Sequence, residues 1–398
     1  MSKEEFKVII SGAGLIGLLI AQALKARNVD YVIFDRDESV QQREQHGWAI
    51  TLHWALQSFK DLLNPQLVEK IYQAQVLPNF HEKDTGNFKY INAHTTESIV
   101  SIPPSKRLRV RREQIRRILL EGIDVDWGCK LVSIDSDDEN VTVKCGNGKE
   151  FRGSVLIGCE GSQSITRKLV CGEDLGTPYQ LPIRFVGSKV RLSKDEVAEI
   201  AEKFDPLLFQ GTTPSNTFFW FSMLSTPEYS GDGYYAQVNV SFPADDNEPF
   251  NTKEEMAAAI MRHSEDLAPE LKKLSDRCVE DWDTLQQIRL VDWPAVEWDN
   301  ANGKVLLCGD SAHAMTMFRG EAANHGITDV KDLMFELDKF LNEGKPWDTA
   351  ANDYCQTIKA RAAPAVMLSR QACLDAHDFT KIKPNSDSPL LSLRKNTK

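Results

Sequence analysis

Short apolar runs alternate with glycine-rich or polar stretches along this chain, and the two clearest runs lie near its two ends. Residues 8–17 read VIISGAGLIG, and the apolar pattern continues to residue 24. This order predicts a strand, a glycine turn and a helix, and YVIFD at residues 31–35 predicts the next strand. Residues 305–314, VLLCGDSAHA, predict another buried strand that ends at a glycine and an aspartate. The pattern predicts an α/β fold.

The middle of the chain changes from mixed patterns to strand-rich ones. Residues 41–64 predict a loop, a short strand and an amphipathic helix, and residues 107–121 predict a single helix. Residues 130–158 predict a β-meander, in which GNG marks a hairpin turn. Residues 180–245 are rich in aromatic and β-branched residues, which is typical of a sheet. This strand-rich part interrupts the nucleotide-binding pattern, so we expect a discontinuous second domain with a substrate cleft between the two.

These patterns predict the following domain organisation. We expect residues 1–75, 101–180 and 281–345 to form a nucleotide-binding domain, residues 76–100 and 181–280 to form a substrate-binding domain, residues 346–376 to form a C-terminal helical region, and residues 377–398 to form a loosely held tail.

The glycine turn near the N-terminus carries the first chemical signal. Gly12 permits a tight turn, Gly14 lets a diphosphate approach the backbone, and Gly17 lets the helix pack against the strand. The helix N-terminus then directs its N–H groups at the phosphates. Asp35 ends the second strand, where a carboxylate accepts a hydrogen bond from a ribose hydroxyl. Together these residues predict a dinucleotide site.

Composition narrows the function classes. The chain has 398 residues, and 47 basic against 58 acidic residues give a formal net charge of −11, which disfavours nucleic acid and anionic membranes as partners. The apolar segment after the glycines is about half of the roughly 20 residues that a membrane span needs, and we expect neither a span nor a signal peptide. The eight cysteines show no CxxC spacing. We therefore expect no metal site, no disulfide framework and a cytoplasmic location.

Three motifs, in order, resemble one family. They are GAGLIG with Asp35, then EGSQSITR with Glu160, Gly161, Ser164 and Arg167, then GDSAH with the following FRGEAANHGITD. The chain resembles the single-component (class A) FAD-dependent monooxygenases of the para-hydroxybenzoate hydroxylase type, and within them the short tetracycline-modifying and natural-product-tailoring members. The resemblance covers residues 7–335. It implies a Rossmann-like FAD-binding domain of the GR2 type, an inserted β-sheet substrate domain and a C-terminal helix.

The resemblance also implies roles for individual residues. Asp310 matches a carboxylate on the ribityl or ribose side of FAD, and Gly309 lets the backbone come close. Residues 320–324 match the loop and helix N-terminus beside the flavin pyrimidine. Arg112 matches an arginine that reaches the diphosphate, with a solvated helix face as the alternative. The predicted cofactor-binding set is Gly12, Gly14, Gly17, Asp35, Arg36, Arg43, Arg112, Glu160, Gly309, Asp310, Gly320, Ala322, Ala323 and Asn324.

Three positions depart from the family pattern near the flavin. Glu160 replaces an aspartate, Met317 stands where a proline is usual, and Ala322 stands where a glycine is usual. Alanine is costly if that position needs a positive φ. The resemblance implies that NADPH or NADH reduces FAD and that reduced flavin and O2 form a C4a-hydroperoxide, which oxygenates a small hydrophobic, aromatic or polycyclic natural product. The alternatives are a flavoenzyme that dehydrogenates, oxidises or rearranges its substrate, and a flavin-free binding protein.

Substrate contacts are less strongly indicated. His53 is a candidate proton carrier or ring contact, and packing at a helix start is its alternative. Arg184 is a candidate partner for an anionic or carbonyl group. In the run Phe218 to Phe221, either Phe218 and Trp220 or Phe219 and Phe221 face a cleft, or all four belong to the core. We expect His313 to be structural and Asp292 to be solvated.

Overall fold

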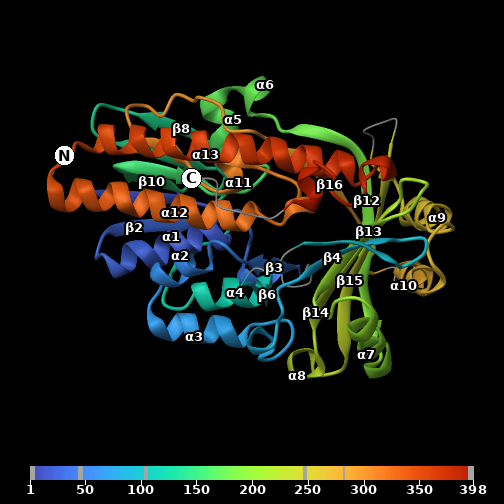
Figure 1. Ribbon diagram of the computed structural model, residues 1–398. Helices are drawn as coiled ribbons and strands as arrows, with labels where there is room; N and C mark the ends of the chain where they lie inside the picture. The colour runs from blue at the N-terminus through green and yellow to red at the C-terminus, as the bar shows by residue number, and fades with distance from the viewer. Residues whose placement is uncertain (1–4, 44–47, 103–105, 245–248, 281–282, 393–398) are drawn as a thin grey trace.

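The computed structural model describes residues 5–43, 48–102, 106–244, 249–280 and 283–392 (Figure 1). The strands are β1 (Lys7–Ser11), β2 (Asp30–Phe34), β3 (Ala49–Leu52), β4 (Phe88–Asn92), β5 (Ser98–Ile102), β6 (Leu108–Arg111), β7 (Val125–Asp126), β8 (Leu131–Ser136), β9 (Val141–Cys145), β10 (Glu150–Gly153), β11 (Val155–Gly158), β12 (Tyr179–Leu192), β13 (Leu208–Thr212), β14 (Phe218–Ser225), β15 (Tyr234–Pro243), β16 (Gln286–Asp292) and β17 (Val305–Leu307).

The helices are α1 (Leu15–Ala26), α2 (Leu56–Asp61), α3 (Pro65–Gln73), α4 (Arg112–Leu119), α5 (Ile165–Cys171), α6 (Glu173–Gly176), α7 (Lys194–Lys203), α8 (Pro227–Ser230), α9 (Lys253–His263), α10 (Pro269–Glu280), α11 (Asp310–His313), α12 (Ala322–Asp338) and α13 (Trp347–Asp375). Shorter turns are η2 (Val40–Arg43), η3 (Phe80–Glu82), η4 (Met317–Arg319), η5 (Lys339–Glu343), η6 (Phe379–Lys381) and η7 (Pro389–Leu391). Within the described ranges, no helix combines the length and the apolar content needed to cross a membrane.

A five-stranded parallel sheet, in the order β17-β11-β1-β2-β7, forms the nucleotide-binding half. It is buried on both faces, as parallel sheets usually are. Val8 and Ile10 of β1 pack against α1, α12 and α13, whereas Ile9 between them packs against the antiparallel sheet β10-β9-β8. This alternation is the period of two that an extended strand imposes. The predicted α/β, Rossmann-like fold is therefore confirmed.

The second half is a seven-stranded sheet in the order β16-β12-β15-β14-β13-β4-β5. Its neighbours are antiparallel except β13 and β4, which run parallel. The outer face carries Phe219 and Phe221 and packs against α9 and α10. The inner face carries Phe218 and Trp220, and these rings pack with Phe318 toward the nucleotide-binding half. Of the alternatives left open for residues 218–221, the structure therefore favours Phe218 and Trp220 as the pair that faces the nucleotide-binding half.

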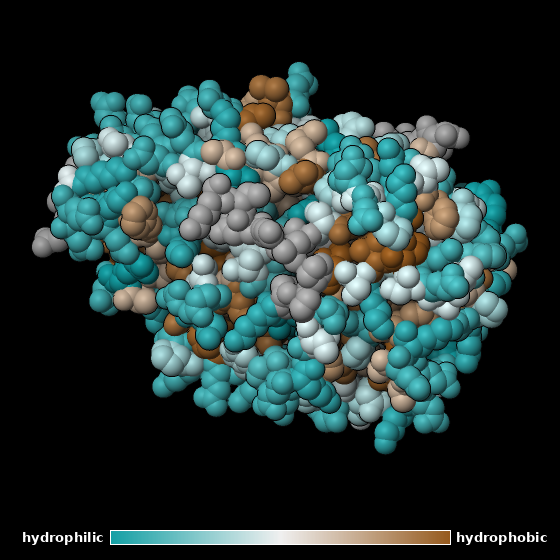
Figure 2. Space-filling model, in the orientation of Figure 1, coloured by the Kyte–Doolittle hydropathy of each residue, from teal (hydrophilic) through white to brown (hydrophobic). Residues whose placement is uncertain are grey.

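The two halves lie side by side, and α13 extends along the first toward the second (Figure 1). The visible face is mainly hydrophilic, with apolar side chains gathered beside the seven-stranded sheet and over α6 (Figure 2). These sheets draw on separate parts of the sequence, and the exact domain bounds predicted above stay a prediction.

Three sequence predictions were wrong in detail. Residues 107–121 do not form one helix, because Leu108 and Val110 pair with β3 as strand β6 before α4 begins. Asp292 is not solvated; it is fully buried, and Arg370 Nε donates to it at 2.8 Å. The tail is not loosely held near its described end, because Leu390 is fully buried in the core beneath the seven-stranded sheet and Ser388 and Leu391 are buried beside it.

Candidate active site

A cavity of about 600 Å³ opens between the two halves. Gly12, Gly14, Asp35, Arg36, Arg112, Glu160, Asp310, Ala322 and Ala323 line it, among other residues. Nine of the fourteen predicted cofactor residues therefore meet at one cavity. This volume lies within the range of ordinary small-molecule sites.

The glycine turn forms one end of this cavity, and each glycine has its own steric reason. Gly12 has φ +103°, and a Cβ there would lie 2.7 Å from the carbonyl oxygen of Cys159. A Cβ at Gly17 would overlap the carbonyl oxygen of Gly12, so this glycine lets α1 pack against the turn. A Cβ at Gly14 would meet no atom within 4 Å, because this position faces the open cavity. The chain thus leaves room at the one glycine that a diphosphate must approach.

Two buried side chains hold the turn in place. Asp35 Oδ2 accepts a hydrogen bond from Ala13 N at 2.6 Å, and Arg116 Nε donates to Ala13 O at 2.9 Å. Asp35 is 5% exposed and still lines the cavity. Arg116 is buried, and sequence analysis did not identify it as a residue that positions the turn.

The Asp310 segment also lines the cavity, and its conformation depends on a buried carboxylate. Gly309 has φ +63°, and its N–H donates to Asp329 Oδ2 at 2.7 Å. His313 Nε2 lies 2.6 Å from the same oxygen, which confirms a structural contact for His313. Burial alone would raise the pKa of Asp329, but His313 and Arg361 outweigh burial and lower this pKa to about 2. Asp329 stays ionised and holds the loop that presents Asp310.

Glu160 lines the cavity, but its carboxylate is largely used within the protein. It accepts hydrogen bonds from Ser11 Oγ at 2.8 Å, from Ser164 Oγ at 2.7 Å and from Thr166 Oγ1. Arg167 of the same motif is fully buried and donates to the carbonyls of Ser162, Gly176, Asp310 and Ser311. This motif therefore ties β11 and the Asp310 segment together.

Helix N-termini and positively charged side chains from several elements lie around the cavity. The N-termini of α1 and α12 reach it at Gly14 and Ala322, and no side chain of the described residues caps either one. Burial raises the pKa of Asp310, whereas His313, Arg112 and Arg167 act in the opposite direction. Arg112 thus lies close enough to influence Asp310 electrostatically. Ala322 is the first residue of α12 and has no positive φ, so alanine is not strained there.

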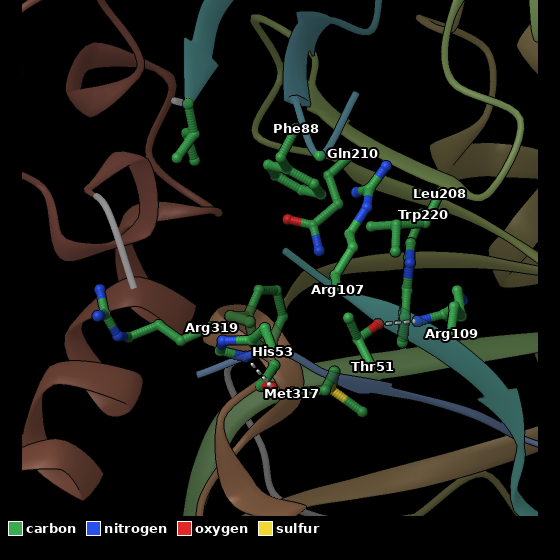
Figure 3. A pocket seen from close by; sticks show the side chains of 14 residues that line it. Thr51, His53, Phe88, Arg107, Arg109, Leu208, Gln210, Trp220, Met317 and Arg319 are labelled. Carbon is green, nitrogen blue, oxygen red and sulfur yellow. Dashed lines mark hydrogen bonds between the residues drawn. The ribbon is translucent and has the colours of Figure 1, made fainter. Parts of the chain in front are cut away.

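A second cavity, of about 110 Å³, adjoins the first (Figure 3). Trp220 and Met317 line both cavities, so they form a shared wall. The second cavity is otherwise lined by Thr51, His53, Gly86, Phe88, Ile102, Arg107, Arg109, Leu208, Gln210, Phe318, Arg319 and Gly320. Trp220 therefore serves a site as well as the core.

His53 lies in this second cavity and is held from both sides. Its Nε2 is 3.2 Å from the carbonyl oxygen of Gly320, and because a carbonyl only accepts, Nε2 carries the hydrogen (Figure 3). Its backbone N–H donates to Asn324 Oδ1 at 3.0 Å. Asn324 is fully buried and also donates to Thr51 O at 3.0 Å. Asn324 therefore positions the His53 segment rather than lining either cavity.

Arg184, a predicted catalytic residue, lines neither cavity. Arg184 lies on β12 with its guanidinium 4.3 Å above the ring of Phe250, on the outer face of the sheet. Its neighbours Ile183 and Phe185 take the inner face because side chains alternate along a strand. Arg43 ends η2, and its side chain lies outside the described part of the chain.

Sequence analysis missed Arg107, Arg109 and Gln210. The helix predicted over residues 107–121 hid the fact that Arg107 and Arg109 alternate along an extended segment, on one face. The strand signal in RLRV was present but overlooked.

The residues of the larger cavity fit FAD. Gly14 leaves open space, two helix N-termini and Arg112 offer positive potential for a diphosphate, and Asp35 and Asp310 offer carboxylate acceptors for hydroxyl groups. When bound, FAD supplies the redox chemistry that the described side chains lack.

The comparisons with known proteins agree. Residues 5–368 match the family described as FAD binding domain. A probable FAD-dependent monooxygenase of Arthroderma benhamiae is 37% identical over 97% of this chain and 95% of its own, and FAD-dependent monooxygenase dbaB of Emericella nidulans is 36% identical over 82% and 85%. The fold also resembles that of Klebsiella pneumoniae HpxO complexed with FAD and uric acid, with TM-score 0.74, 18% identity, and coverage of 95% of this chain and 91% of that one. The chain belongs to the FAD-dependent monooxygenases of the para-hydroxybenzoate hydroxylase-like family.

Proposed function

We propose that this monooxygenase takes electrons from NADPH or NADH and inserts one oxygen atom of O2 into a small aromatic or polycyclic natural product. The balance is one substrate, one O2, one NAD(P)H and one proton to one hydroxylated substrate, one NAD(P)⁺ and one water. The adjoining cavities are the single observation that carries this proposal, because they place a substrate-sized space beside the cofactor-sized one across Trp220 and Met317.

Different residues of the chain bind the cofactor, surround the substrate and hold a proton. The glycine turn, Arg112 and Asp310 hold FAD in the larger cavity. Phe88, Trp220 and Phe318 surround the smaller one with aromatic side chains, which excludes water and orients a flat ring. His53 holds a hydrogen at Nε2 against the Gly320 carbonyl, and its ring is within reach of a bound substrate.

The size of the smaller cavity favours one ring at the reacting end of the substrate. Its 110 Å³ is of the same order as a cavity of about 150 Å³ that holds benzene. The uric acid in the HpxO complex is likewise a small ring system. A polycyclic substrate would place one ring in this cavity and the rest outside it.

The first test is spectroscopic. We expect the purified protein to show flavin absorbance, to lose it when NADPH or NADH is added without oxygen, and to regain it when air is admitted. With a turned-over substrate, ¹⁸O2 should place one labelled atom in the product. Flavin that neither nucleotide reduces, or product without label, would contradict the proposal and favour dehydrogenation or oxidation.

A further inference from the structure

Arg109 is a deeply buried cation whose bonded partners are neutral. It is 6% exposed and lies on β6, where it lines the smaller cavity. Its guanidinium donates to Thr51 Oγ1 at 2.6 Å (Figure 3) and also to Ser222 Oγ. Across the described ranges Arg109 forms no ion pair, and a buried charge without a counter-charge is costly. The Arg109 guanidinium therefore has no carboxylate in direct contact, although Asp205, which pairs with Arg107, acts on it electrostatically.

The other two arginines of the same cavity show the contrast. Arg107 Nε donates to Asp84 at 2.7 Å and its NH2 group to Asp205 at 3.1 Å. Arg319 Nε donates to Glu321 at 2.6 Å. Each of these guanidiniums contacts a carboxylate directly, whereas Arg109 contacts only the hydroxyl groups of Thr51 and Ser222.

Further polar atoms of this cavity are also unsatisfied. Arg109 Nε, Gln210 Oε1 and Trp220 Nε1 are buried and have no hydrogen-bond partner among the described residues. Buried polar groups are normally hydrogen-bonded, so three such atoms in residues that line one cavity favour a polar ligand there. Burial is the main cause that lowers the pKa of Arg109, to about 9; the charge of Arg107 lowers this pKa further, and the charge of Asp205 acts in the opposite direction. Arg109 is still protonated at neutral pH.

We propose that Arg109 binds an ionised oxygen of an aromatic substrate, either a carboxylate or the oxygen of an acidic phenol or enol. Trp220 Nε1 is a neutral donor to the substrate, and Gln210 Oε1 is an acceptor for a separate O–H or N–H group of the substrate. This inference rests on the proposed function, because it names the substrate class of the same cavity. Arg109 does not line the larger cavity, so its role concerns the substrate and leaves FAD binding unaffected.

Two matched pairs of probes test the charge without turnover. FAD-loaded enzyme is titrated in a calorimeter, without NAD(P)H, with benzoate against benzamide and with 4-nitrophenol against 4-nitroanisole. We expect at least one anion to bind roughly 10- to 100-fold more tightly than its neutral partner, which is the usual worth of hydrogen bonds to a charged group. The pair that shows the preference identifies carboxylate or phenolate as the group recognised. Equal binding within both pairs would overturn the proposal.

Variants then assign the preference to Arg109. Arg109→Met should remove the preference for the anion, and Arg109→Lys should keep part of it, since lysine retains the charge but not the planar fork. Arg152→Met, at an exposed arginine of β10, is the matched control and should keep the full preference. FAD content and thermal unfolding establish that each variant is folded. If Arg109→Met does not fold, Arg109→Lys carries the test, and an unchanged preference in it overturns the assignment.

The proposed function fails in a different way. If an Arg109-dependent anion site exists but no ¹⁸O is incorporated, the oxygenation proposal fails and the anion site stands. If the flavin is reduced and reoxidised normally while anions bind no better than neutral probes, the monooxygenase proposal stands and the anion site fails.

Discussion

The two cavities lie side by side but are built in different ways. The larger one is shaped mainly by backbone: a glycine turn, two helix N-termini and the Gly309 loop. The smaller one is shaped by side chains from β3, β6, β13, β14 and η4, which the fold brings together from distant parts of the sequence. His53 and Gly320, for example, are 267 residues apart and share a hydrogen bond.

This difference explains which site a sequence reveals. A backbone cradle needs glycine at fixed spacings, so its residues form a local motif. A side-chain cavity needs only that a few side chains face the same space, and strands supply them without a fixed spacing. The class of cofactor can therefore be predicted from local sequence motifs, whereas the class of substrate depends on how the fold arranges side chains in three dimensions.

The strongest way to test the comparison is at the glycine turn. Gly17→Ala should destabilise the protein by more than about 3 kcal/mol and abolish FAD retention, because the new Cβ overlaps the Gly12 carbonyl and neither backbone segment can move freely. Thermal unfolding and flavin content of the purified variant measure the two effects.

Gly14→Ala is the matched control within the same turn. Its Cβ meets no protein atom within 4 Å and its φ of −80° suits alanine, so the FAD-free protein should lose no more than about 1 kcal/mol, the usual cost of alanine at a helix N-cap. FAD affinity should nevertheless fall at least about tenfold, because the methyl group occupies space that the diphosphate needs. Equal loss of fold stability in both variants would contradict the backbone-cradle description.

Much of the fold and the larger cavity could be predicted from sequence. The strand–glycine–helix unit, Asp35 and the Asp310 segment all lie in local patterns, and nine of the cofactor residues line one cavity. The predictions failed where tertiary context overrides local pattern. RLRV looked like the start of an arginine-rich helix until its pairing with β3 was known, and Asp292 looked solvated because its partner Arg370 lies 78 residues away.

The shared wall is the next place to test the comparison. Trp220→Ala should cost about 3 kcal/mol of stability, as is usual for removing a large buried aromatic side chain, and should join the two cavities. Admitting water there should raise the fraction of NAD(P)H oxidised without product. Trp220→Phe keeps most of the ring and should be affected far less. A Trp220→Ala enzyme that remains fully coupled would show that the wall does not separate the sites.

Asn324 connects the two cavities through the backbone and should have an intermediate effect. Asn324→Leu leaves the N–H of His53 and the carbonyl of Thr51 without their buried partner. Each unsatisfied group costs about 1–3 kcal/mol, so we expect the two groups together to lower the free energy of unfolding by at least about 2 kcal/mol. If the smaller cavity depends on this link, probe binding should weaken more than FAD binding. An equal loss at both sites would mean that Asn324 supports the fold as a whole.

The smallest expected effect is a pH dependence that both regions share. Burial lowers the pKa of His325, beside the larger cavity, to about 3, with the charges of His313 and Arg361 adding to it, and burial lowers that of His377, beneath the seven-stranded sheet, to about 4. His377 Nδ1 donates to Cys373 O at 2.7 Å, so Nε2 accepts from Ser241 Oγ, and a proton on Nε2 would break that bond.

Both histidines are neutral in the folded protein at pH 6, whereas the unfolded chain binds protons at an ordinary histidine pKa of about 6.5. Stability is therefore full above that value and is lost as pH falls toward the folded pKa. Each histidine should lower the free energy of unfolding by about 1 kcal/mol at pH 6 relative to pH 8, which corresponds to a decrease of roughly 2 °C in melting temperature. His325→Gln and His377→Gln should each remove about half of this pH dependence. The check is the melting temperature of each variant at pH 6 and pH 8, measured at constant ionic strength. If only one variant flattens the profile, the two regions differ in how they tolerate a proton, and the other histidine is charged in the folded protein.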